Sequence, residues 1–332
     1  MGAKRTAIVV GAVAATAVVV LARRSARAHA LTDPRLDGMA PVPPKSERMV
    51  RSADGTEIHV AEYGPDDAPI VVLVHGWTCG IGFFTNQIWA LSTDLHVVAY
   101  DLRGHGGSAI PAKGQFTTDE LADDLAAVLR ATVPDGRKAV AFGHSMGAMS
   151  IVALAARHPR LLHEKVSATV LANTGVTSLV ADSRLQPGPD LLRRLTAPLN
   201  RAILSAPLPL GRPIGATMPM IRYIGLAPGA APEHVAFCAH VILDTPPTVR
   251  GGFGATLGTL DLRLAVPHLD LPTTVVTGEL DILTPPAMGQ RLASDLPQAR
   301  LVEVEGVGHM TPVEAPQVLE REIRAMVQTA VV

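Results

Sequence analysis

Short, wholly apolar runs separated by helix-length segments constrain this sequence more than any other feature. Runs without a polar face are typical of parallel strands that helices cover on both sides of a sheet. Regular alternation of such strands with helices predicts an α/β fold with a doubly wound sheet. The expected strands are Ile70–Val74, His96–Tyr100, Lys138–Phe142, Val166–Leu171, Thr273–Thr277 and Arg300–Val304. The expected helices are Phe83–Leu91, Thr117–Ala131, Met146–Arg157, Pro285–Leu296 and Pro312–Gln328.

Two stretches depart from this alternation. Near the start, Glu57–Tyr63 alternates polar and apolar residues after the turn Asp54-Gly55, which predicts a β-hairpin. Further on, residues 175–264 hold 11 of the 27 prolines, many Leu, Ile and Met residues and no clear strand. Such an interval is too long for a connection within a compact sheet, so we expect a helical cap insertion there.

Charge and composition exclude several classes of protein. The 29 Lys and Arg residues balance the 30 Asp and Glu residues, whereas a nucleic-acid-binding protein usually carries a basic surplus. A hydrophobic content of 48% excludes intrinsic disorder. The 2 cysteines cannot form a disulfide framework, and we expect two free thiols. No metal-binding or phosphate-binding motif occurs, so we expect neither a metal nor a cofactor.

The N-terminus is a second concentration of apolar residues. The stretch Ala7–Ala22 carries no charge and has basic residues on both sides. It favours a single-pass membrane anchor within residues 1–30, and a signal peptide cleaved after Ala28-His29-Ala30 is the alternative. The flanking basic residues are nearly balanced and select no side of the membrane. Residues 31–46 are rich in proline and predict a linker, followed by the main domain over residues 47–330.

The segment Gly143-His144-Ser145-Met146-Gly147 lies between an expected buried strand and an expected helix. Glycines on both sides permit the sharp turn that lifts a serine hydroxyl above the edge of a sheet. The N-terminus of the following helix adds a partial positive charge where an oxyanion would form. A serine becomes a good nucleophile only with a base that an acid orients. The turn therefore predicts Ser145 as a nucleophile with two partners elsewhere in the chain.

Asp281 and His309 are the expected partners. Each follows an expected strand, and open α/β sheets place their ligands at the carboxyl ends of strands. Glu279 is a competing acid, but its position still belongs to the end of the strand. Two backbone N–H groups should bind the oxyanion, that of Met146 and that of Trp77 in the loop after Ile70–Val74.

Together these motifs resemble the α/β-hydrolase fold superfamily over roughly residues 47–327. The matching residues are His75-Gly76-Trp77, Asp101 to Ser108, Gly143 to Gly147, Asp281 and His309. The resemblance implies an eight-stranded, mostly parallel sheet flanked by helices, with a helical cap after the sixth strand. It also implies that Asp101 and Arg103 belong to a structural loop. Epoxide hydrolases and haloalkane dehalogenases of this fold use a carboxylate nucleophile, and Ser145 stands at that position here.

These residues predict a serine esterase or lipase-like hydrolase that cleaves carboxylic esters. Ser145 attacks the carbonyl carbon, His309 transfers the proton, and Asp281 orients the imidazole. The aliphatic cap favours a small-molecule ester with an apolar acyl or alcohol part. One alternative is a cofactor-free perhydrolase or haloperoxidase-like enzyme that uses the same three residues. The other is a non-catalytic, membrane-tethered ligand-binding protein that keeps the fold.

Overall fold

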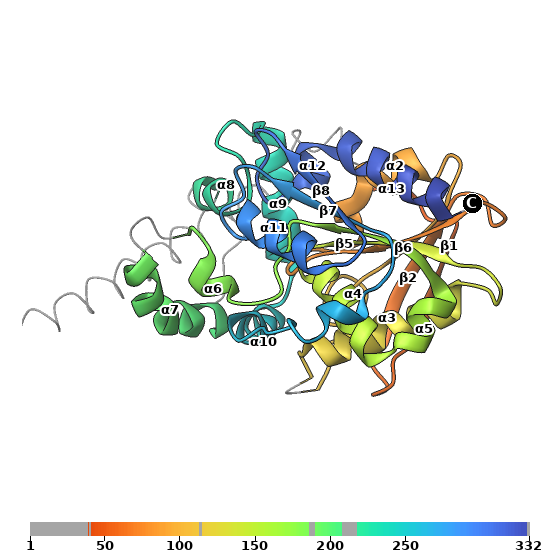
Figure 1. The fold of residues 1–332 in the computed structure, drawn as a ribbon, viewed down its shortest axis with the longest axis horizontal. Coiled ribbons are helices and arrows are strands. Elements are labelled where there is room, and N and C mark those ends of the chain that lie inside the picture. Colours follow the sequence, from red (N-terminus) through yellow and green to blue (C-terminus); the bar gives the residue numbers. More distant parts are fainter. Residues whose placement is uncertain (1–38, 40, 113–114, 186–189, 208–217, 331–332) are drawn as a thin grey trace, which may run out of the picture.

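A single eight-stranded sheet forms the centre of the molecule (Figure 1). The computed structural model describes residues 39, 41–112, 115–185, 190–207 and 218–330. The strand order is β1-β2-β4-β3-β5-β6-β7-β8, with β1, β2 and β4 paired antiparallel and all other neighbours parallel. The strands are β1 Ser46–Arg51, β2 Glu57–Tyr63, β3 Ile70–Val74, β4 His96–Tyr100, β5 Ala139–His144, β6 Val166–Ala172, β7 Thr273–Gly278 and β8 Ala299–Val304.

Helices cover both faces of this sheet, which explains why its strands have no polar side. Successive residues of a strand point to opposite faces, so Val72 belongs to one buried core and Val71 and Leu73 to the other. The first core lies under α3 and α4, and the second lies under α2 and α13, on opposite sides in Figure 1. The helices outside the insertion are η2 Ile81–Phe84, α2 Thr85–Leu91, α3 Thr118–Thr132, α4 Met146–Arg157, α5 Pro159–Lys165, η3 Val266–His268, α11 Pro286–Asp295, α12 Thr311–Glu314 and α13 Pro316–Ala330.

The predicted fold class is confirmed, and the expected strands lie within two residues of their predicted ends. The predicted helix Pro312–Gln328 is wrong in one respect, because the structure divides it into α12 and α13. Pro316 stands at the break. A proline disfavours a helical conformation of the residue before it, and Ala315 has φ −143° and ψ 58°. The short helix α5 was not predicted.

In the described part of the interval between β6 and β7, helices joined by loops replace the strand–helix alternation. Its helices are α6 Leu179–Asp182, α7 Asp190–Ser205, α8 Met218–Gly225, α9 Pro232–Asp244 and α10 Pro247–Gly258. An isolated bridge between Thr177 and Asp261 joins the two ends of the interval. That this insertion acts as a cap stays a prediction.

The predicted anchor or signal segment, residues 1–30, lies outside the described residues, as does most of the linker. Within the described ranges, no helix is long and apolar enough to cross a membrane. The first strand begins at Ser46, one residue before the predicted start of the main domain.

Candidate active site

The turn between β5 and α4 holds Ser145 in a backbone conformation that few residues adopt. Its φ is 53° and its ψ is −115°. Strain of this kind persists only where the surrounding structure enforces it, and it gathers at functional sites. The Ser145 N–H donates to the carbonyl of Ala172 at 2.8 Å, and its carbonyl accepts from Thr174 Oγ1 at 3.0 Å. The backbone is thus fixed on both sides, while the residue stays partly exposed.

Three glycines make this turn possible because the backbones around it are in close contact. A Cβ on Gly147 would lie 2.0 Å from the carbonyl oxygen of Val74 at the end of β3. A Cβ on Gly143 would lie 2.5 Å from the nitrogen of Ala148. On the other side, a Cβ on Gly76 would lie 3.2 Å from the Cβ of Ser145. The loop after β3 therefore packs directly against the serine.

Asp281 and His309 are joined at the same edge of the sheet. Asp281 follows β7, His309 follows β8, and the Asp281 Oδ2 lies 2.8 Å from the His309 Nδ1. Both side chains are buried. Burial disfavours ionisation of Asp281, but the charge and hydrogen bond of His309 and the hydrogen bonds from Thr284 hold its pKa below the ordinary value. An ionised carboxylate only accepts, so Nδ1 carries the proton and Nε2 is left to act as a base.

Glu279, the competing acid, lies elsewhere. It is exposed, and its carboxylate accepts from the N–H of Gly306 at 2.9 Å. The structure therefore brings Asp281, and not Glu279, to His309.

Two polar side chains that the sequence analysis missed also hold Asp281. Asn173 follows β6 with φ 50°, and its Nδ2 donates to Asp281 Oδ2 and to the carbonyl of Gly308, both at 3.1 Å. The Thr284 hydroxyl donates to the same carboxylate oxygen at 2.7 Å. Asn173 thereby links the acid to the loop that carries His309. Its place after an apolar strand, like that of Asp281, is the signal that would have found it.

His144 links the serine turn to the base and was also missed. Its Nε2 lies 2.9 Å from the carbonyl oxygen of His309, and the two ring centroids are 5.0 Å apart. Burial, followed by the charge on His309, lowers the pKa of His144 to about 3. The ring is therefore neutral at ordinary pH, and Nε2 donates because a carbonyl oxygen can only accept.

The two predicted oxyanion donors, the N–H groups of Trp77 and Met146, have no backbone acceptor among the described residues. The carbonyl of Gly76, in the same peptide group as the Trp77 N–H, accepts from His75 Nδ1 at 2.8 Å and from the Cys79 N–H at 3.2 Å. Because the C=O and N–H of a trans peptide point in opposite directions, the bonds that hold the Gly76 carbonyl also fix the orientation of the Trp77 N–H.

Neutral histidines support this loop. Burial lowers the pKa of His75, and its Nε2 accepts from the Leu102 N–H at 2.9 Å. Burial, followed by the repulsion that a protonated His75 would exert, lowers the pKa of His105 to about 3. The Nε2 of His105 accepts from the Thr78 N–H at 3.2 Å, and Thr78 has a φ of 61°. His75 and His105 thus connect the loop after β3 to the loop after β4.

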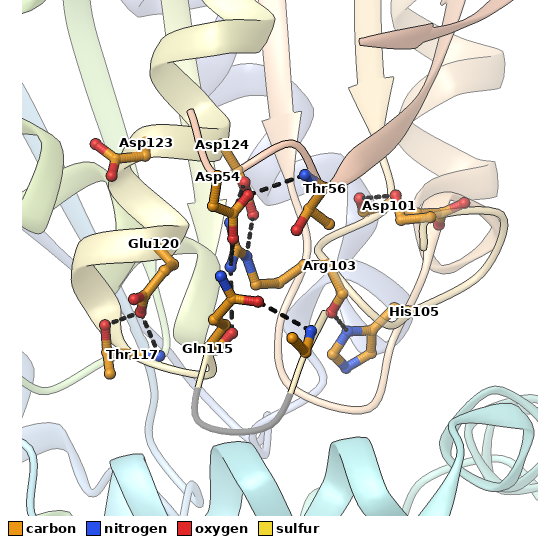
Figure 2. Close-up of polar contacts among 12 residues, drawn as sticks. Asp54, Thr56, Asp101, Arg103, His105, Gln115, Thr117, Glu120, Asp123 and Asp124 are labelled. Atoms are coloured by element: carbon orange, nitrogen blue, oxygen red, sulfur yellow. Dashed lines mark hydrogen bonds and ion pairs between the residues drawn. The ribbon is translucent and has the colours of Figure 1, made fainter. Parts of the chain in front are cut away.

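The loop after β4 is anchored by a buried ion pair, shown in Figure 2. The Arg103 guanidinium is joined to Asp124 of α3 by two contacts of 2.7 Å and to Asp54 by one of 2.9 Å. The side chains of Arg103 and Asp124 have no exposed surface. The Arg103 carbonyl in turn accepts from His105 Nδ1 at 3.0 Å. Arg103 therefore lies in the scaffold beneath the loop of Trp77.

Asp101 has a similar part in the scaffold. Its carboxylate accepts from the N–H groups of Ile81 and Gly107, at 2.8 and 2.9 Å, and contacts His59 Nδ1 at 2.9 Å. Through Asp101, at the end of β4, these contacts connect the start of η2, the turn after β4 and the strand β2.

The insertion contacts the loop of His309 directly. The Gly225 carbonyl, at the end of α8, accepts from the His309 N–H at 3.0 Å. Glu314 bridges the same two segments, because its carboxylate accepts from the Ala227 N–H at 2.7 Å and from the Gly308 N–H at 3.1 Å. The inserted helices therefore border the candidate site.

The arrangement suits acyl transfer. It contains a hydroxyl on a strained turn, an imidazole oriented by a buried carboxylate, and two N–H groups that have no backbone acceptor among the described residues. In the described part of the chain, no group of three or more His, Cys, Asp or Glu side chains is arranged to hold a metal ion.

Comparisons with known proteins agree with this fold. A bifunctional esterase/perhydrolase of Acinetobacter calcoaceticus is 26% identical over 84% of this chain and 99% of its own. A non-heme chloroperoxidase of Streptomyces lividans is 30% identical over 84% of this chain and 99% of its own. The crystal structure of a hydrolase from Pseudomonas aeruginosa superposes with a TM-score of 0.69 at 25% identity, covering 85% of this chain and 98% of that one. Residues 71–322 match the model of the alpha/beta hydrolase family, and the chain belongs to that family.

Proposed function

We propose that this hydrolase cleaves carboxylic esters by transferring the acyl group to Ser145. One observation carries the proposal. A partly exposed serine on a strained turn lies at the sheet edge where Asp281 and His309 meet at 2.8 Å. Relatives named as esterases support the choice of ester substrates.

In the first half of the reaction, the Ser145 oxygen attacks the carbonyl carbon while His309 Nε2 takes the hydroxyl proton. The imidazolium is stabilised by the Asp281 carboxylate. The tetrahedral intermediate collapses, the carbon–oxygen bond to the alcohol breaks, and His309 protonates the leaving alkoxide. In the second half, water attacks the acyl-enzyme, His309 again takes a proton, and the acid leaves as the Ser145 hydroxyl is restored.

The N–H groups of Trp77 and Met146 are the proposed donors to the oxyanion. Both are backbone groups and cannot be removed by side-chain substitution. Loss of one such donor typically lowers turnover by about 10²–10³. The hydrogen bonds that orient the peptide of Trp77 therefore contribute directly to the proposed rate.

The experiment that tests this function is labelling with a fluorophosphonate, which forms a covalent bond with an activated serine. Wild-type protein should be labelled, and Ser145→Ala should not. Ser150→Ala is the matched control because Ser150 lies on α4, the helix that follows Ser145, and its buried hydroxyl donates to the Met146 carbonyl. A folded wild-type protein that resists labelling would contradict the proposal.

We propose further that the substrate has an apolar acyl or alcohol part. Apolar residues of α8 and α9, including Ile221 and Phe237, share a core with Met310, which follows the candidate base. A series of p-nitrophenyl esters of increasing acyl length tests this. Medium chains should have a higher kcat/KM than acetate, and acetate as by far the best substrate would contradict it.

Perhydrolysis is a second candidate, supported by the names of two relatives. In that reaction hydrogen peroxide replaces water in the second half and releases a peracid. Measuring peroxide-dependent halide oxidation beside ester hydrolysis separates the two. A non-catalytic ligand-binding role would instead show binding of apolar esters without fluorophosphonate labelling.

The membrane anchor proposed within residues 1–30 is tested by mapping the N-terminus of the mature protein. An intact start supports an anchor, and a start near Leu31 would reject it in favour of a cleaved signal peptide.

A further inference from the structure

Helix α7 carries a row of four large aliphatic side chains that face solvent. Leu191, Leu195, Leu199 and Ile203 are 69%, 69%, 62% and 54% exposed. Residues four apart lie on one face of a helix, so the four form a continuous surface, here called the α7 stripe. Single exposed leucines are ordinary, whereas contiguous apolar surface on a folded protein marks a contact site.

The stripe is not a face that the rest of the domain covers. The C-terminal half of α7 already packs closely on α10, beside it in Figure 1. A Cβ on Gly254 would lie 2.0 Å from the Leu204 carbonyl oxygen, and one on Gly251 would lie 2.8 Å from that of Ser205. These contacts fix the end of α7 on α10, while the four side chains of the stripe remain in water.

The chemistry of α7 indicates what covers this face. The helix is strongly amphipathic but has low overall hydrophobicity, which is typical of helices that lie in the plane of a membrane surface. Its residues include three arginines, Arg193, Arg194 and Arg201, against one acid, Asp190. By composition the helix is therefore net positive, which favours a surface that carries anionic headgroups. The stripe contains only Leu and Ile, whereas protein interfaces depend most on Trp, Tyr and Arg.

We propose that the α7 stripe docks on a lipid bilayer that carries anionic headgroups, with its four aliphatic side chains entering the boundary with the acyl chains. Docking is separate from ester hydrolysis and is measured without turnover. It would place the insertion, whose α8 contacts the loop of His309, beside a source of apolar esters. It does not require the predicted anchor, although an anchor would keep the stripe near the membrane.

The test uses the full chain with a polarity-sensitive thiol dye on Leu199→Cys. Cys79 and Cys238 are buried, and burial raises the pKa of both thiols, so the dye reacts at the new cysteine. The matched control is Trp89→Cys, since Trp89 is 73% exposed on α2, far from α7 in Figure 1. Vesicles contain equal parts of phosphatidylcholine and phosphatidylglycerol with brominated acyl chains. Thermal unfolding verifies that each labelled protein is folded.

We expect the vesicles to quench the dye at position 199 several-fold more than the dye at position 89. Adding Leu195→Glu should reduce the quenching at position 199 several-fold, because a charge enters the stripe. Equal quenching at both positions would overturn the proposal. So would an absence of quenching at position 199 when flotation of the vesicles in a density gradient shows that the protein is bound to them. So would equal quenching by vesicles of phosphatidylcholine alone. A dye response without vesicles that rises with protein concentration and a doubled mass would assign the stripe to a second copy instead.

Discussion

Replacing Asp124 by Asn tests the buried ion pair beneath the loop of Trp77. Arg103 and Asp124 have no exposed side-chain surface and share two contacts of 2.7 Å. Asn keeps the volume but removes the charge, so the guanidinium stays buried with only Asp54, 2.9 Å away, to balance it. Removing one partner of a buried pair typically costs about 3–5 kcal/mol. Because Asp54 remains, we expect a loss near the lower limit, about 3 kcal/mol, which is large against a total stability of about 5–15 kcal/mol.

Urea unfolding with linear extrapolation measures this loss. Asp123→Asn is the control, since Asp123 lies next to Asp124 but pairs with Arg157 and His158, whose side chains are 41% and 25% exposed. Ion pairs that reach solvent contribute about 0–1 kcal/mol, so the control should lose less stability than Asp124→Asn. The double variant Arg103→Met/Asp124→Leu should recover most of the stability, because it leaves no fully buried charge; Asp54 loses Arg103, but its side chain is 19% exposed and still accepts from the Thr56 N–H. Equal losses in the two Asn variants, or no recovery in the double variant, would refute the reasoning.

Three further predictions concern the serine turn, a partly buried histidine and the catalytic acid. Gly147→Ala should prevent folding or activity, since its Cβ would meet the Val74 carbonyl at 2.0 Å, while Gly82→Ala, with nothing within 4 Å, should be harmless in thermal unfolding and labelling. The pKa of His59 is raised by its hydrogen bond to a neighbouring carboxylate, against burial, so its contribution to stability is complete below about pH 6.5 and is lost as pH rises through the folded-state pKa. As pH rises through this range, the urea midpoint of the wild type should decrease, whereas that of His59→Gln should not. Parallel curves of midpoint against pH for the two proteins would contradict this. Asp281→Asn should lower the kcat of ester hydrolysis by about 10⁴ with KM nearly unchanged, and a small loss of kcat in steady-state assays would reject its role.

The order of strands and helices was predictable because it depends on local patterns. Wholly apolar runs such as Ile70–Val74 form strands wherever helices cover both faces, and the capping box of Thr117 with Glu120 starts α3 where expected. The break at Pro316 was also visible in the sequence but was overlooked. The short α5 and the path of the inserted helices depend on packing against distant elements, for which the sequence has no periodic signal.

The strained serine turn and the order Ser, Asp, His along the chain could be predicted from the sequence alone, because each follows from residues adjacent to a strand end. Which side chains surround these residues depends on tertiary contacts. Asn173 meets Asp281 across 108 positions, and His144 meets the His309 carbonyl across 165. Those contacts exist because β5, β6, β7 and β8 are neighbours in the sheet, so their carboxyl ends converge at one edge. The exposure of the α7 stripe was decided in the same way, since α10 packs on one face of the helix and leaves the other in water.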